Sequence, residues 1–129
     1  MNNKRINISS NSPWEDIVEY SRAVKVDKSI FVSGTTATKD GEIIGINDPY
    51  EQTIQCIKNI ESALLKANSN LTDVVRIRIY VLNIDDWEVI GKALNKYFNT
   101  IKPAATMVEV NRLITPELLV EIEADAYIS

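Results

Sequence analysis

The stretch Val75-Arg-Ile-Arg-Ile-Tyr-Val81 decides the fold, because its side chains alternate strictly between apolar and polar. Successive side chains of a β-strand point to opposite faces of a sheet, so this stretch predicts a strand with one buried face and one charged face. Residues 120–126 repeat the pattern, with apolar side chains separated by Glu121, Glu123 and Asp125. We therefore expect a sheet whose two faces differ in chemistry.

Two amphipathic helices are predicted, one on each side of this strand in the chain. In the first, over residues 50–67, apolar side chains recur at three- and four-residue spacing and so share one helical face. They are Ile54, Ile57, Ile60, Leu64 and Ala67. The stripe of the second helix, over residues 86–99, consists of Trp87, Ile90, Leu94, Tyr97 and Phe98. Pro49 suits the start of the first helix, and Asp85 followed by Glu88 predicts a capping box at the start of the second.

The remaining strands complete a β-β-(β)-α-β-α-β-β order. They are expected at residues 20–26, 29–35, 42–44 and 106–110. Asp27 and Lys28 form a two-residue hairpin turn between the first two, and residues 39–42 form a second turn. Both helices can cover the apolar face of one sheet, which is the two-layer α+β arrangement. Residues 1–129 fit a single domain, in which residues 1–10 are either flexible or an edge strand.

Composition excludes several kinds of chemistry. The 129 residues include no histidine, which excludes histidine general bases, Ser-His-Asp triads and nearly every zinc site. The net charge of −4 argues against a protein that binds nucleic acid. The single cysteine, Cys56, fits a reducing compartment, and we expect it to be a small buried hydrophobe. No apolar run is long enough to cross a membrane, so we expect a cytoplasmic protein without a membrane partner. With the observations above, we also expect no metal, no cofactor and no nucleic-acid partner.

The charged sheet face is the most informative surface that the sequence predicts. By strand parity it collects Arg76, Arg78, Tyr80, Met107, Glu109, Glu121, Glu123 and Asp125. One interpretation is a solvated face, which antiparallel sheets tolerate. The interpretation that we favour is an interface between copies of the chain, because arginine and tyrosine mixed with carboxylates can pair across a subunit boundary. Clefts lined by such residues would remain between the subunits.

Six segments form a recognisable set: 12–15 (SPWE), 20–23 (YSRA), 31–34 (FVSG), 75–81 (VRIRIYV), 102–110 (KPAATMVEV) and 119–124 (LVEIEA). Together they resemble the RidA/YjgF family, whose members were once described as translation inhibitors or endoribonucleases. The resemblance covers about residues 12–128, in the family's order and spacing. It implies a chorismate-mutase-like α+β fold and a homotrimer whose sheets form a central barrel. It also implies three small-molecule sites at the subunit interfaces.

Active members of this family hydrolyse reactive enamines and imines, such as 2-aminoacrylate, to keto acids and ammonia. A pocket arginine binds the substrate carboxylate with its bidentate guanidinium, and a glutamate on the last strand helps to position the attacking water. The resemblance places that glutamate at Glu121, as the candidate catalytic residue. It places a pocket tyrosine at Tyr20 and a Ser-Gly pair of the site at Ser33 and Gly34.

Three positions depart from the family pattern. Ala105 stands where the active members have the arginine, Gly91 where an asparagine is often found, and Met107 where they have a cysteine. Losing the arginine costs on the order of 2–5 kcal/mol of transition-state binding. The chain therefore resembles the arginine-lacking subgroups of the family, in which the deaminase activity is not to be assumed.

Three other arginines are candidates for the lost carboxylate contact. Arg78 is the first, since it projects toward the same face as Glu121, and its alternative role is a salt bridge between subunits to Glu121 or Glu123. Arg112 could act from the loop after the fifth strand, where a solvated side chain is the alternative. Arg22 is the third candidate.

Several site assignments keep a structural alternative. Tyr20 either lines the pocket, which we favour, or packs as an interface aromatic. Gly34 either belongs to the site or permits a tight turn, and Ser33 lacks the histidine that a nucleophile would need. Trp14 is expected in a loop at a subunit boundary, whereas Trp87 is expected in the core.

Three classes of function remain open, in the following order. The first is a hydrolase acting on imines, enamines or another carbonyl-like metabolite with altered pocket chemistry. The second is a metabolite-binding or regulatory trimer without catalysis, and the third is a protein-interaction module. The expected partners are further copies of the chain and a small carboxylate or carbonyl-containing metabolite.

Overall fold

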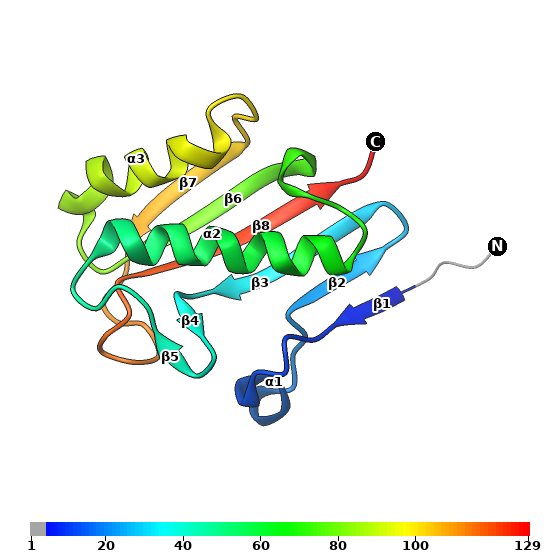
Figure 1. The fold of residues 1–129 in the computed structure, drawn as a ribbon, viewed down its shortest axis with the longest axis horizontal. Helices are drawn as coiled ribbons and strands as arrows, with labels where there is room; N and C mark the ends of the chain where they lie inside the picture. Colours follow the sequence, from blue (N-terminus) through cyan, green and yellow to red (C-terminus); the bar gives the residue numbers. More distant parts are fainter. Residues whose placement is uncertain (1–4) are drawn as a thin grey trace.

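The computed structural model describes residues 5–129 as a sheet covered by two long helices (Figure 1). The elements follow in the order β1 (Arg5–Ile8), α1 (Pro13–Val18), β2 (Ala23–Val26), β3 (Ser29–Thr35), β4 (Thr38–Lys39), β5 (Glu42–Ile43), α2 (Pro49–Lys66), η1 (Leu71–Asp73), β6 (Val74–Val81), η2 (Ile84–Asp86), α3 (Trp87–Phe98), β7 (Ala104–Glu109) and β8 (Val120–Tyr127). None of the helices in the described range is long and apolar enough to cross a membrane.

The main sheet has the strand order β1-β2-β3-β8-β6-β7, and β4 and β5 form a separate small ladder. Its neighbouring strands are antiparallel except β6 and β7, which run parallel. Helices α2 and α3 lie together over one face and leave the other open (Figure 1). The predicted two-layer α+β arrangement is therefore confirmed, as is the turn at Asp27 and Lys28 between β2 and β3.

The core lies between α2 and the central strands. Ile57 and Ile60 of α2 are fully buried, and so are Val81 of β6 and Ile122 of β8. Each such aliphatic side chain contributes about 1.5–3 kcal/mol by leaving water. The alternation that predicted β8 holds along its length, because Val120, Ile122, Ala124 and Ala126 are buried while the residues between them are not. Cys56 is also fully buried, as expected.

The prediction that Met107 and Glu109 of β7 lie on the charged sheet face was wrong. Met107 pairs with Ile79 and Glu109 with Val81, so both lie on the helical side of the sheet with those apolar partners. Met107 packs against the core, and a Glu109 carboxylate oxygen accepts a hydrogen bond from the backbone N–H of Ile84 at 3.0 Å. The prediction failed because it took the phase of β7 from its own sequence, whereas the pairing register with β6 sets it.

Three further local predictions were wrong. Val75 is exposed, because a bulge after Val74 shifts the alternation of β6 and buries Val74 instead. The capping box at Asp85 does not form, because residues 84–86 make the 3₁₀ turn η2, whose cap is Asn83. Trp87 consequently begins α3 on the solvent side and is 58% exposed.

Helix α1 replaces the loop that was expected around Trp14. The Ser12 hydroxyl caps the helix by accepting a hydrogen bond from the backbone N–H of Trp14, and Pro13 follows at the first helical position. Serine at the cap with proline next is a strong start signal even for a helix of six residues.

Candidate functional site

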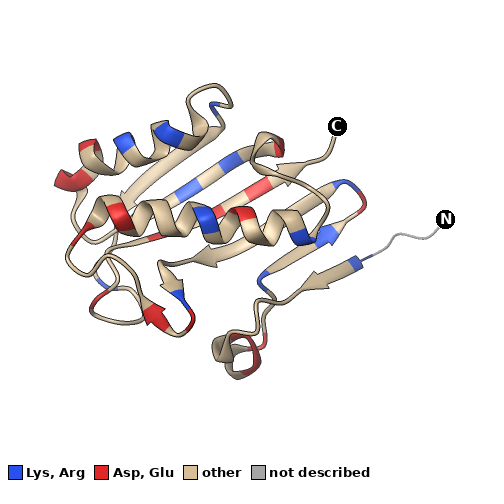
Figure 2. Ribbon diagram, viewed as in Figure 1, with Lys and Arg blue, Asp and Glu red and all other residues tan. Residues whose placement is uncertain are grey.

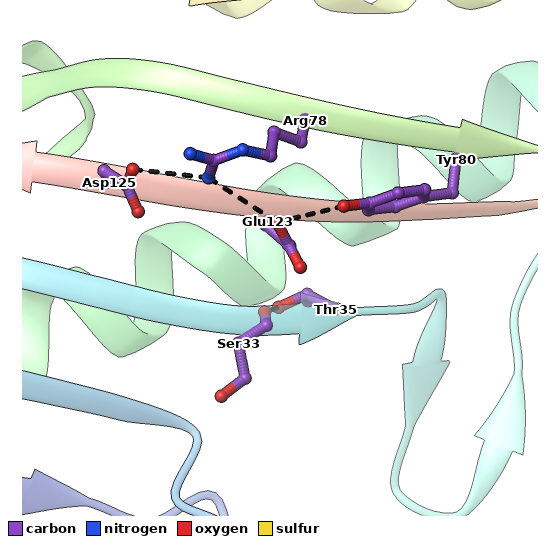
Figure 3. Close-up of polar contacts among 6 residues, drawn as sticks. All are labelled: Ser33, Thr35, Arg78, Tyr80, Glu123 and Asp125. Atoms are coloured by element: carbon purple, nitrogen blue, oxygen red, sulfur yellow. Dashed lines mark hydrogen bonds and ion pairs between the residues drawn. The ribbon is translucent and has the colours of Figure 1, made fainter. Parts of the chain in front are cut away.

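Basic residues on β6 lie beside acidic residues on β8 (Figure 2), and the register Arg76↔Asp125 and Arg78↔Glu123 places them together on the sheet face away from the helices. One Arg78 nitrogen lies 3.3 Å from an Asp125 carboxylate oxygen and 3.5 Å from a Glu123 oxygen (Figure 3). Tyr80 donates its hydroxyl to Glu123 at 3.2 Å. Arg78 therefore faces two carboxylates of its own chain, and a ligand carboxylate would have to compete with them.

Glu121 lies on the same face, and its carboxyl rests directly on the backbone of Gly34. A Cβ atom added at Gly34 would collide with the Oε2 atom of Glu121 and would lie 3.0 Å from its Cδ. The missing side chain at Gly34 is therefore the space that the carboxyl occupies. This is a close approach of two groups, rather than a turn, that requires glycine.

Burial raises the pKa of the Glu121 carboxyl above its ordinary value. The positive charge of Arg22 acts in the opposite direction, and the negative charge of Glu123 adds to the rise. A carboxyl with a raised pKa favours the folded state at low pH, and that contribution is lost as the pH rises through the folded-state pKa. Ionised Glu121 thus costs stability, which is typical of a group kept for binding or proton transfer.

Tyr20 and Ser33 lie near the open end of the β2–β3 hairpin, close in the chain to Arg22 and Gly34. The Tyr20 hydroxyl accepts a hydrogen bond from Arg22 at 3.2 Å, and the guanidinium carbon of Arg22 lies 5.5 Å from the centre of the Tyr20 ring. The Ser33 hydroxyl donates to the backbone carbonyl of Ser21 at 2.6 Å, so it joins two segments of the hairpin. The structure therefore links Tyr20 to Gly34 through Arg22 and places the Glu121 carboxyl against Gly34, while the shared role of these residues as a site stays a prediction.

Ala105 and Met107 belong to a different surface. Ala105 lines a hollow of about 220 Å³ between α3 and the edge of the sheet. Most of its lining is apolar, and it consists of Ile77, Gly91, Leu94, Asn95, Phe98, Asn99, Lys102, Pro103 and Ala105. The two positions at which polar residues of the family pattern are missing, Gly91 and Ala105, thus meet in one hollow.

Within a single chain, Glu121 and its neighbours do not meet the hollow that Ala105 lines. Ala105 pairs with Ile77 on the helical side of the sheet, whereas Glu121 faces the open side. Strand β6 separates β8 from β7, which places these two strands about 10 Å apart. The residues assigned to one site therefore come from opposite faces of the sheet.

Two residues that support the site were missed at the level of sequence. Gln52 of α2 is fully buried, and its amide bonds the backbone carbonyl of Glu117 at 2.9 Å and the backbone N–H of Leu119 at 2.8 Å. It thereby fixes the chain just before Glu121. Thr35 is also buried, and its hydroxyl bonds Arg22 and the carbonyl of Ser33. A glutamine inside the apolar stripe of a helix was the available signal for the first; the second had none.

Within residues 5–129 no cluster of three or more cysteine, aspartate or glutamate side chains could hold a metal ion. The site is accordingly one of carboxyl, hydroxyl, guanidinium and backbone groups. Such a set can bind a small polar molecule and transfer protons to or from it.

Comparison with known proteins gives a consistent result. Residues 10–128 match the family model described as Endoribonuclease L-PSP. RutC family protein PYRAB12510 of Pyrococcus abyssi is 39% identical over 110 residues, which cover 84% of this chain and 85% of that protein. Protein HMF1 of Saccharomyces cerevisiae is also 39% identical over 110 residues, covering 83% of this chain and 81% of that one.

A solved structure extends the match to three dimensions. Rv2704 of Mycobacterium tuberculosis, described as a member of the YjgF/YER057c/UK114 family, superposes with a TM-score of 0.89. It is 45% identical to this chain and covers 97% of it, with 100% of Rv2704 covered in return.

Proposed function

Because the chain belongs to the RidA/YjgF family and has its chorismate-mutase-like fold, we propose that it assembles into a homotrimer with a small-molecule site at each subunit boundary. We infer that it acts there as a hydrolase on an imine, an enamine or a related carbonyl compound. The observation that carries this proposal is the half-buried Glu121 carboxyl, with its raised pKa, held against Gly34 beside Tyr20.

The separation of the site residues supports a site shared by two chains. Glu121 lies on the open sheet face, and Ala105 lies on the edge strand beside α3. If the edge strand of one copy lies against the open face of another, both groups line the same cleft. The open face also exposes Phe31 and Tyr127, about half of each side chain, and aromatic residues are enriched at interfaces.

Glu121 is suited to act as both general base and general acid. Water adds to the carbon of a protonated C=NH₂⁺ group while Glu121 takes one of the protons of the water, so the nitrogen becomes an NH₂ group. Return of that proton to the nitrogen gives an NH₃⁺ group, which leaves as ammonia when Glu121 takes the proton of the new hydroxyl and the C–O bond becomes a carbonyl. Burial brings the pKa of Glu121 closer to neutral pH, and a group whose pKa lies near the working pH both accepts and donates a proton efficiently.

Ala105 favours a second candidate, a trimer that binds a metabolite without converting it. At Ala105 no guanidinium is present to hold a substrate carboxylate, and the surrounding hollow is mostly apolar. A site with Glu121 but without this contact can bind a carbonyl compound yet fail to orient it for attack by water. Activity toward 2-aminoacrylate separates the two candidates.

Replacing Glu121 with glutamine should weaken the site more than the same change at Glu117. The substitution keeps the shape of the side chain and removes its charge, so we expect at least a tenfold loss of pyruvate binding, about 1.4 kcal/mol. Glu117 is the matched control, because it lies exposed in the turn before β8. Pyruvate titrations followed by NMR would measure binding, and equal losses in the two variants would remove Glu121 from the site.

A further inference from the structure

Arg22 lies just before β2 and contacts more of the candidate site than any residue assigned to it from the sequence. Its Nη1 atom donates hydrogen bonds to the backbone carbonyl of Gly34 at 2.9 Å and to the hydroxyl of Thr35 at 3.0 Å. Its Nη2 atom donates to the Tyr20 hydroxyl at 3.2 Å. One guanidinium thus connects the tyrosine of the site with the strand segment that supports Glu121.

The donors of Arg22 are directed into the protein rather than toward a ligand. A guanidinium has five N–H groups, and both on Nη1 and one on Nη2 are used by these contacts. The Nε atom is buried and has no hydrogen-bond partner among the described residues. A carboxylate needs two adjacent, accessible N–H groups for bidentate binding. Arg22 therefore does not offer the open edge that would replace the missing family arginine.

The segment that Arg22 holds is the one on which the carboxyl rests. The pairing of β3 with β8 shifts register between Val32 and Thr35, so Gly34 lies in an irregular part of the strand. Arg22 bonds the two residues at the end of this irregularity, Gly34 and Thr35. The Glu121 carboxyl packs against Gly34, where no side chain intervenes. A change in the position of Arg22 is thereby transmitted to the surface beneath Glu121.

The charges around Glu121 give Arg22 a second effect. Glu123 faces Glu121 from β8 and raises its pKa, whereas Arg22 lowers it. The negative charge of Glu121 also acts on Tyr80 of β6 and on Cys56 of α2. Burial, and after it the charge of Glu121, raises the pKa of the Cys56 thiol. Burial likewise raises the pKa of the Tyr80 hydroxyl, so both groups are neutral at ordinary pH.

Glu15 shares the positive charge of Arg22 from the side of α1. Burial opposes ionisation of Glu15, but hydrogen bonds from Ser10 and Ser9, together with the Arg22 charge, hold the pKa of its carboxyl below its usual range. Arg22 therefore lies between an ionised carboxylate at Glu15 and a carboxyl at Glu121 that resists ionisation.

We propose that Arg22 is the positioning residue of the site: its hydrogen bonds fix Tyr20 and the Gly34 segment on which the Glu121 carboxyl rests. It acts through these groups and does not touch the ligand. The consequence for turnover rests on the proposed function, but the positioning itself is measurable without any ligand.

The test compares Arg22→Gln and Arg22→Lys with Lys58→Gln in the full-length, assembled protein. Lys58 is exposed on α2, on the other side of the sheet, so its variant removes one positive charge at a distance. The pKa of Glu121 would be followed by carboxyl ¹³C NMR, and the mobility of the Gly34 segment by amide exchange at Thr35. Thermal melts would report folding.

Arg22→Gln should raise the pKa of Glu121 above the wild-type value, because burial and Glu123 then act without an opposing charge. Arg22→Lys should keep most of the charge effect while the Thr35 amide exchanges faster, since lysine cannot make the three-way contact. A Glu121 pKa in Arg22→Gln equal to that in Lys58→Gln would overturn the proposal. So would an Arg22→Lys protein identical to wild type in amide exchange.

The same measurements test the positioning role of Arg22 separately from the proposed function. A normal pKa response at Glu121 combined with no effect of Glu121→Gln on pyruvate binding would leave the positioning intact and reject the function. An unchanged pKa combined with a strong Glu121→Gln effect would do the reverse. If Arg22→Gln does not fold, the Arg22→Lys comparison still decides the contact geometry.

Discussion

Gly34→Ala should displace the Glu121 carboxyl without unfolding the protein. The new methyl group would occupy the position of Oε2 and lie 3.0 Å from Cδ, and the atoms that must move belong to the far end of a flexible side chain. The backbone at Gly34 is not left-handed, so the backbone conformation itself accepts alanine and we expect the protein to stay folded. A misplacement of about 1 Å in a site can cost on the order of 100-fold in function, and we expect a loss approaching this size.

The measurement is the pKa of Glu121 together with pyruvate binding and a thermal melt. We expect the pKa to fall toward the ordinary value of an exposed glutamate, because the carboxyl moves into solvent. A Gly34→Ala/Glu121→Gln double variant is the control, since adding the methyl group to a site already without its carboxylate should cost little more. A raised pKa that persists in Gly34→Ala, with unchanged binding, would show that the carboxyl does not depend on this contact.

Ala105→Arg should restore part of an activity that the wild-type protein lacks. Wild type is expected to hydrolyse 2-aminoacrylate little faster than buffer, because no guanidinium at Ala105 holds the substrate carboxylate. The substitution should raise the rate about tenfold, or about 1.4 kcal/mol in the barrier. The structure gives room for the longer side chain, because Ala105 is exposed and the adjacent Gly91 has no atom within 4 Å of an added Cβ.

The assay would follow enamine loss with wild type, Ala105→Arg and buffer alone, with the assembly state checked in parallel. A wild type as fast as an active family member would contradict this account of Ala105. Two inactive proteins that are both folded and assembled would favour the binding protein over the hydrolase. Arg78 is not expected to obstruct the new side chain within one chain, since it lies on the opposite sheet face, paired with Glu123 and Asp125.

Alternation and helical spacing predicted the elements whose burial is decided within the element. The α2 stripe from Ile54 to Leu64 and the β8 alternation are buried as expected, because each is set by one periodicity and one apolar surface. The face of β7 was not predictable in this way. Its phase depends on a parallel pairing with β6, and strand sequences of this length do not specify that register.

The ends of elements were harder to predict for a related reason. At Trp87, the 3₁₀ turn η2 moved the start of α3 and rotated the tryptophan out of the core. A bulge after Val74 had the same effect on Val75. Both depend on local hydrogen bonding that several nearby polar residues could have satisfied differently.

The candidate site was predicted as a set of residues but not as a geometry. Arg22 links Tyr20 to Gly34, and Glu121 lies against Gly34, so the arrangement is compatible with the site that the resemblance implied. The contribution of Arg22 was visible only in the fold, because its partners Gly34 and Thr35 lie in an irregular strand segment 12 and 13 residues away. Arg78, the first candidate for a ligand contact, proved to have carboxylates of its own beside it.

The central claim is that two chains build each site, and sedimentation velocity at micromolar concentration tests it most directly. We expect one species with three times the 14.5 kDa mass of the chain, as the proposed homotrimer requires. Because Glu121 and Ala105 of one chain lie on opposite faces of its sheet, a second chain is needed to complete each site. A monomer at that concentration would contradict it, since no single chain could then bring Glu121 and Ala105 to the same ligand.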